Sequence, residues 1–224
     1  MVSRCEARNH FRFIKDTSFA FPEYSSFAFP KLTFGKAQKV LAFRSLLCTF
    51  AEKSKMAIIK SVNGLEPKWG KECYFSENAA IVGEVTMGDE CSVWFNAVVR
   101  GDVAPVTMGD RVNVQDGAVV HVTNKIGPTI IEDDVTIGHN ATVHACTLKR
   151  GCLIGMGSTV LDNAVVGEGA VVAAGALVLG RTVIGPHEIW GGVPAKFIKK
   201  TNPDQAESYA RHYVEYSKWY LAEE

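Results

Sequence analysis

Aliphatic residues recur every six positions along most of the chain, in a series that starts at Ile81 and ends at Ile184. This period fits neither an α-helix nor an alternating strand. It is typical of a parallel β-helix, in which each hexapeptide forms one short strand. Because three hexapeptides complete one coil, the series predicts about six coils. The alternative, a sandwich of alternating strands, would require a two-residue rhythm.

The six-residue phase is interrupted at three points. Three extra residues follow Val99, five extra residues follow Val120, and one residue is missing after Val143. Insertions into a regular solenoid usually gather on a working face. We therefore expect the first two interruptions, around residues 102–105 and 124–128, to be loops beside a functional site.

Once these interruptions are counted, Arg100, His121 and His144 occupy the same position in successive coils. Coils stack at the strand spacing of about 4.8 Å, so His121 and His144 can meet one metal ion. His139 falls on a different face of the same prism. A catalytic zinc site uses three protein ligands and one open position, which indicates that a neighbouring subunit supplies its own His139. The alternative is that these histidines face solvent or hydrogen-bond across an interface.

Residues 1–55 lack the repeat and are basic, with ten Lys and Arg residues against four Asp and Glu residues. We expect them to be an N-terminal extension outside the fold, followed by a β-helix domain over residues 56–201. This interpretation predicts a cytoplasmic protein. The alternative is an organelle transit peptide, which would direct the protein to a compartment such as the mitochondrion.

Residues 202–224 have the pattern of a C-terminal helix, with Asn202 as its cap and Pro203 in its first turn. Tyrosines at positions 209, 213, 216 and 220 lie along one side of this helix. We expect the stripe to pack the helix on the β-helix. The alternative for Tyr209 and Tyr213 is that a hydroxyl group reaches a neighbouring subunit's metal site.

Composition argues against several kinds of partner and bond. Lys and Arg together number 24, as do Asp and Glu, which gives no electrostatic reason for binding nucleic acid. No apolar run approaches the roughly 18 residues of a membrane-spanning helix. The six cysteines are widely spaced, without a C-x-x-C pair, so we expect reduced thiols rather than a disulfide framework.

Four motifs carry a resemblance to a known family. They are Val99-Arg100-Gly101-Asp102, residues 113–117 (Asn-Val-Gln-Asp-Gly), His121 with residues 137–144 (Ile-Gly-His-Asn-Ala-Thr-Val-His), and residues 190–195 (Trp-Gly-Gly-Val-Pro-Ala). Together they closely resemble the γ-class carbonic anhydrase family over residues 60–201. The resemblance implies a mainly β fold, namely a left-handed parallel β-helix of hexapeptide repeats with a C-terminal α-helix, assembled as a homotrimer.

The resemblance also implies a metal site between subunits. His121 and His144 resemble the two ligands from one subunit, and His139 resembles the ligand from its neighbour. The metal would be zinc, with Fe²⁺ or Co²⁺ as alternatives, because three imidazoles suit several divalent ions. The implied reaction is the reversible hydration of carbon dioxide to bicarbonate by metal-bound hydroxide, which makes the protein a lyase of the carbonate dehydratase type.

Five further residues match functional positions of the family. Arg100 and Asp102 resemble an ion pair that joins subunits. Gln115 resembles the residue that hydrogen-bonds the metal-bound hydroxide. Asn113 and Asp116 correspond to residues beside the site or at the subunit interface.

Two departures from the family concern proton release. Some active members carry a glutamate at the position of Val103 and another on an acidic loop after the first ligand histidine, whereas the loop here reads Val-Thr-Asn-Lys-Ile-Gly-Pro-Thr. Metal binding is therefore a firmer prediction than turnover, and a site that binds metal with weak or absent hydration is an alternative to rapid hydration. Two other functions are alternatives. One is a hexapeptide acyltransferase or CoA-thioester enzyme, which would use one histidine as general base, and the other is an assembly protein whose metal only holds the trimer.

Overall fold

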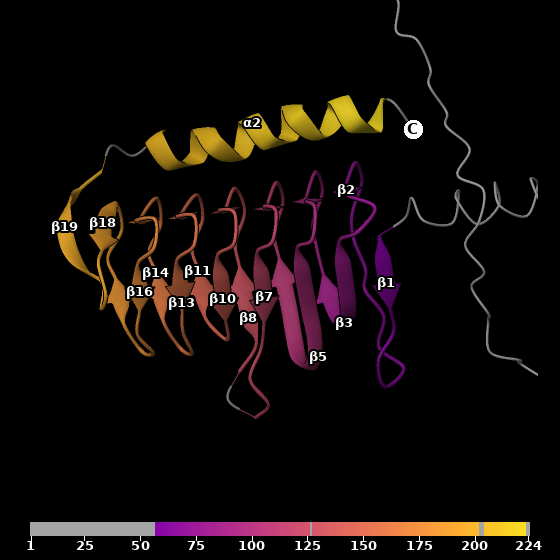
Figure 1. The fold of residues 1–224 in the computed structure, drawn as a ribbon, viewed down its shortest axis with the longest axis horizontal. Helices are drawn as coiled ribbons and strands as arrows, with labels where there is room; N and C mark the ends of the chain where they lie inside the picture. The colour runs from indigo at the N-terminus through magenta and orange to yellow at the C-terminus, as the bar shows by residue number, and fades with distance from the viewer. Residues whose placement is uncertain (1–56, 126, 202–203, 223–224) are drawn as a thin grey trace, which may run out of the picture. The chain divides into compact units, whose positions relative to one another are not determined.

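The computed structural model describes residues 57–125, 127–201 and 204–222. Over these residues the chain winds into a parallel β-helix with one α-helix along its side (Figure 1). This confirms the mainly β, hexapeptide-repeat fold predicted from the sequence. The predicted extension, residues 1–55, lies outside the described residues, so the domain boundary stays a prediction, as does the left-handed sense of the coil.

Three stacks of short strands form the sides of the β-helix. The first stack contains β1 (Ile58–Lys60), the starts of β3 (Ala80–Thr86) and β5 (Val98–Met108), β7 (Val119–His121), β10 (Thr142–His144), β13 (Thr159–Val160) and β16 (Leu177–Val178). The second contains the ends of β3 and β5, then β8 (Thr129–Ile131), β11 (Thr147–Leu148), β14 (Val165–Val166) and β17 (Val183–Ile184).

The third stack forms a sheet of its own. It contains β2 (Tyr74–Phe75), β4 (Ser92–Val93), β6 (Asn113–Val114), β9 (Thr136–Ile137), β12 (Leu153–Ile154), β15 (Val171–Val172), β18 (Glu188–Gly191) and β19 (Lys196–Lys200). All strand pairs in the three stacks are parallel except β18 and β19. The antiparallel β19 therefore ends the series of coils.

The aliphatic residue of each hexapeptide points into the β-helix. Ile81, Val99, Val120 and Val143 are register partners in successive coils of the first stack, and each is fully buried. Burying a side chain of this size stabilises the fold by about 1.5–3 kcal/mol relative to leaving it exposed. The repeat thus specifies the coil, because it returns one aliphatic side chain to the interior on every side.

The first insertion does not form the predicted loop. Instead β5 continues as one strand around the corner of the prism, pairing with the first stack at its start and with the second at its end. The register of its neighbour β3 shifts between Gly83 and Val85, as in a β-bulge. A bulge leaves extra residues unpaired and disrupts the ladder only locally, so β5 continues past the insertion as one longer strand.

The second insertion is a loop, as predicted. It connects β7 with β8 and is closed by an antiparallel bridge between Thr123 and Gly127. Residue 126, inside this loop, lies outside the described residues. Both insertions therefore sit beside the strand that carries His121.

The α-helix α2 (Asp204–Leu221) runs along the third stack and contacts β2, β4 and β9 (Figure 1). Among residues 208–222, its buried line consists of Ala210, Val214 and Ser217. The predicted tyrosine stripe lies beside this line, and two of its members contact the coils as expected. Small side chains let the helix approach the strands closely, while Tyr213 and Tyr220 flank the contact and pack against aromatic residues of the coils.

Two further features concern the whole described region. Its four cysteines, at positions 73, 91, 146 and 152, are free thiols. No helix in the described part of the chain is long and apolar enough to cross a membrane.

Candidate metal centre

Two of the three predicted histidine ligands lie side by side. Strands β7 and β10 pair in parallel with His144 opposite His121, as the coil count predicted. The Nδ1 atom of His121 is 3.1 Å from the Nε2 atom of His144. One nitrogen from each ring therefore points into the same small space at the edge of the first stack.

The other nitrogen of each ring faces a carboxylate. Nε2 of His121 lies 3.1 Å from Oδ1 of Asp102, and Nδ1 of His144 lies 2.7 Å from Oδ1 of Asp162. An ionised carboxylate can only accept hydrogen bonds, so these outer nitrogens carry the hydrogens. The two inner nitrogens of neutral rings then present lone pairs to each other, an arrangement that a cation between them stabilises.

The spacing of the inner nitrogens suits a tetrahedral metal. With zinc–nitrogen bonds of about 2.0–2.1 Å, two ligands of a tetrahedron are about 3.3 Å apart. The 3.1 Å separation of His121 and His144 is close to that value. The donor set, two imidazoles whose outer nitrogens are tied to carboxylates, is also the usual form of histidine at a metal. The residues present therefore fit a divalent metal.

His139 lies on another face of the β-helix, after β9. Its Nδ1 atom is 2.7 Å from Oδ2 of Asp116, and its Nε2 atom is 3.5 Å from the hydroxyl oxygen of Tyr213. Within the described residues of one chain, no three His, Cys, Asp or Glu side chains form a group that could hold a metal. One subunit thus brings two of the predicted ligands together and keeps the third apart.

The corner after His139 is built by a left-handed residue. Asn140 has a φ of 56°, a conformation that asparagine adopts more readily than most residues. One coil earlier, Gly117 follows Asp116 with a φ of 69°, and a Cβ atom there would lie 2.3 Å from Oδ1 of Asn140. The turn residues therefore stack the two corners tightly, which places Asp116 next to His139.

Gln115 and Asn113 are buried together near His139. The side-chain Nε2 of Gln115 donates to Oδ1 of Asn113 at 3.0 Å, and Nδ2 of Asn113 donates to Thr136 at 2.9 Å. Gln115, His139 and Tyr213 line a pocket of about 450 Å³ between the third stack and α2. Tyr209, exposed on the next turn of the helix, lines the same pocket, whose other walls are mostly aliphatic and aromatic.

Asp102 joins two of the candidate residues. Arg100 Nη1 donates to Oδ2 of Asp102 at 2.5 Å, while the other carboxylate oxygen faces His121. Burial alone would raise the pKa of Asp102, but hydrogen bonds from His121 and Arg100 outweigh it and hold this pKa below its usual value. The ion pair forms within one subunit here, and a pair between subunits stays a prediction.

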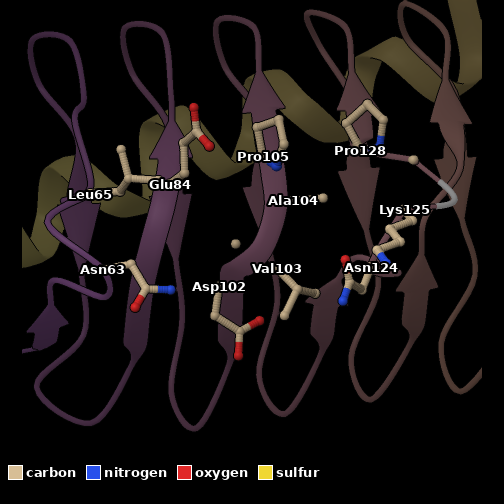
Figure 2. A pocket seen from close by; sticks show the side chains of 12 residues that line it. Asn63, Leu65, Glu84, Asp102, Val103, Ala104, Pro105, Asn124, Lys125 and Pro128 are labelled. Carbon is tan, nitrogen blue, oxygen red and sulfur yellow. The ribbon is translucent and has the colours of Figure 1, made fainter.

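A second pocket lies on the outer side of Asp102. It has a volume of about 690 Å³ and is lined by residues of β5, of the loop after β7 and of the segment near Asn63 (Figure 2). Val103 lies on its wall and is 46% exposed. Glu84 and Lys125 are among its other labelled residues in Figure 2. The departure from the family at Val103 therefore sits on the wall of a pocket that also contains Asp102, the partner of His121.

Sequence reasoning missed Asp162 and Thr123. Asp162 follows by two residues Val160, which is the register partner of Val143 in the next coil. Counting coils beyond His144 leads to Leu161, its equivalent in the next coil, and Asp162 is the residue that follows. Nothing in the sequence marks Thr123, because its position in the irregular loop after β7 cannot be derived from the repeat.

Comparison with known proteins identifies the family. The model of the bacterial transferase hexapeptide family (six repeats) matches residues 145–180. A carbonic anhydrase of Geobacillus kaustophilus is 40% identical over 168 residues, 74% of this chain and 92% of that protein. Gamma carbonic anhydrase 1, mitochondrial, of Arabidopsis thaliana is 40% identical over 73% of this chain and 62% of that protein. The structure of a hexapeptide transferase family protein from Anaplasma phagocytophilum is 36% identical, with a TM-score of 0.69, over 73% of this chain and 98% of that one.

The chain is a hexapeptide-repeat β-helix protein, and it belongs to the γ-class carbonic anhydrase family. This confirms the resemblance drawn from the four motifs. The match takes in 62% of the plant relative's length, so that protein extends well beyond the shared region.

Proposed function

We propose that this protein is a metal-dependent carbonic anhydrase of the γ class, which hydrates carbon dioxide reversibly to bicarbonate with zinc as its metal. The observation that carries the proposal is the pair of facing ring nitrogens of His121 and His144, each ring held from behind by a carboxylate. Family membership supports it, because relatives at 40% identity are named carbonic anhydrases.

The third ligand in this proposal is His139 of a neighbouring subunit in a homotrimer. In the chain, His139 comes after β9, and so lies between His121 on β7 and His144 on β10 along the solenoid. If the threefold axis runs parallel to the solenoid, every residue keeps its height in the next subunit. A neighbouring His139 then arrives at a height between the two facing rings, where the third ligand of a tetrahedral site is needed.

The side chains of this site have separate tasks. A divalent metal held by three imidazoles supplies a Lewis acid that lowers the pKa of water to about 7. The buried amide of Gln115, fixed by a hydrogen bond to Asn113, would orient the attacking hydroxide beside His139. The aliphatic and aromatic walls of the pocket under α2 suit an apolar gas. Asp102, Asp116 and Asp162 each hold one histidine ring.

Proton release is the slow part of the proposed reaction. Hydration produces one proton per turnover, and this proton must leave the site. Val103, an apolar residue on the wall of the outer pocket, cannot carry it, and the loop after His121 contains no acid. Water, buffer and Glu84, which lines the same pocket, are the acceptors that remain, so the rate should depend on buffer concentration.

Mixing two inactive variants tests the shared site. His139→Ala removes the ligand given to the neighbour, and His144→Ala removes a ligand from the facing pair, so each variant alone should bind no metal at the site. In trimers assembled at random from equal amounts of both, about one quarter of the sites should contain all three histidines. Metal content and carbon dioxide hydration should both return to that fraction.

Two results would count against the proposal. One is full metal content in His139→Ala alone, since the third ligand would then lie elsewhere. The other is no recovery in mixed trimers whose size and thermal stability match the wild type. The matched control is His187→Asn, which replaces a histidine in the turn between β17 and β18, outside the pocket under α2, and should change neither quantity.

A further inference from the structure

The ring of His144 is held by two residues outside the family motifs. Asp162 Oδ1 lies 2.7 Å from its Nδ1 atom, and Thr123 donates its hydroxyl hydrogen to the other oxygen of Asp162 at 2.8 Å. The Thr123 hydroxyl oxygen is also 3.3 Å from Nδ1 of His144. These three side chains form a closed triangle on the side of the imidazole that faces away from His121.

The backbone of Asp162 is anchored by the coils on both sides of it. Its carbonyl oxygen accepts a hydrogen bond from the N–H of Arg181 in the following coil at 2.9 Å. The next residue, Asn163, donates its N–H to the carbonyl oxygen of Ala145 in the preceding coil at 2.7 Å. A rigid element therefore presents the carboxylate, which is the condition for a precise supporting contact.

We infer that Asp162, supported by Thr123, is the positioning residue that keeps the hydrogen of His144 on Nδ1 and directs the bare Nε2 atom into the metal site. The inference rests on the proposed function for what Nε2 binds. An ionised carboxylate offers only acceptors, so the Nδ1 it touches must donate. A ring without this partner can place its hydrogen on Nε2, where it blocks the metal.

Replacing Asp162 by asparagine changes this chemistry with little change in shape. An asparagine side chain can turn its NH₂ group toward Nδ1, which then accepts, and the hydrogen of the neutral ring moves to Nε2. The Asp162 side chain is 31% exposed, and the coil is held by its aliphatic interior rather than by this contact. We therefore expect Asp162→Asn to fold and melt like the wild type.

The test follows the two ring nitrogens directly in the metal-free protein. With ¹⁵N-labelled histidine and only six histidines in the chain, the signals of His144 are identified by their loss in His144→Gln. The wild type should show Nδ1 protonated and Nε2 bare. In Asp162→Asn, part or all of the signal should move to the form protonated at Nε2. Asp110→Asn is the matched control, because Asp110 caps a neighbouring turn without touching a histidine.

Metal affinity is the second measurement that tests the role of Asp162. Zinc competition against a chromophoric chelator should show binding weakened about 10–100-fold in Asp162→Asn, the usual cost of losing a partner of a metal-ligating histidine. Thr123→Val should weaken it less, because the carboxylate remains. Asp110→Asn should bind like the wild type.

An unchanged His144 tautomer in Asp162→Asn would overturn the inference, whatever the metal affinity. So would wild-type affinity in that variant. A wild-type protein that binds no zinc would overturn the proposed function instead, and the nitrogen signals would still decide whether Asp162 holds the ring as stated.

Discussion

His121 and His144 face each other across adjacent coils, with their nearest ring nitrogens 3.1 Å apart. Each turns its other nitrogen to a carboxylate, Asp102 for one ring and Asp162 for the other. The pair is polar, partly exposed and placed at the edge of an otherwise aliphatic stack. Such an arrangement adds little to the stability of the solenoid, so we interpret the histidine pair as a binding site.

Metal removal should separate an enzyme from an assembly protein. We expect chelation to abolish hydration while the proposed trimer persists. The thermal midpoint should stay close to that of the metal-loaded form, because the coil is held by its aliphatic interior. Light scattering after size exclusion, with metal content measured on the same fractions, checks this. Dissociation into monomers on chelation would favour the assembly role instead.

Tyr213→Phe should slow hydration without altering its pH dependence. Burial, followed by the charge of Asp116, raises the pKa of Tyr213 to about 12, so its hydroxyl group remains protonated at neutral pH. It lies 3.5 Å from the Nε2 atom that His139 would give to the metal, where it can donate a hydrogen bond to the substrate. Losing one hydrogen bond of about 1 kcal/mol lowers kcat/KM about fivefold. Tyr209→Phe, one turn earlier in the same pocket, is the control and should have no effect. A changed pH profile between pH 6 and 9 in Tyr213→Phe would refute this role.

Val103→Glu should speed hydration at low buffer concentration. The side chain is 46% exposed on the wall of the pocket beside Asp102, so a carboxylate there can pass protons to solvent (Figure 2). We expect a rise of about tenfold or more in dilute buffer, the lower range for a positioned acid or base, and little change in concentrated buffer. Val103→Gln has nearly the same size and cannot carry the proton. Equal rates in the two variants would show that proton release is not limiting.

The repeat predicted the fold because each hexapeptide forms its own strand and turn from residues that are close in the sequence. Each aliphatic residue of the series returns to the interior, so counting sixes located the partner of His121 at His144 and separated His139 from both. The count failed where the structure depends on contacts between side chains or on backbone that departs from the repeat. A bulge beside Gly83 turned a predicted loop into part of β5, and the contact of Thr123 with Asp162 depends on the shape of a loop.

Acid should weaken the fold at a corner remote from the histidines. A hydrogen bond from Lys149 is the largest cause that lowers the pKa of Glu132, and the backbone N–H of Asp110 is the largest that lowers the pKa of Asp133. Carboxylates with depressed pKa values stabilise the folded state above their unfolded pKa, about 4, and lose that contribution as the pH falls below it. We expect the thermal midpoint to drop between pH 5 and 3. Asp133→Asn should flatten the drop; an equally steep drop in that variant would contradict the assignment.

The most direct test of the central claim is stopped-flow carbon dioxide hydration by zinc-loaded wild-type protein and by His144→Ala, with metal measured on the same samples. The account predicts hydration that rises in proportion to bound zinc in the wild type and disappears, together with the zinc, in the variant. Bound zinc without hydration, even in concentrated buffer, would contradict it and leave the acyltransferase and assembly alternatives.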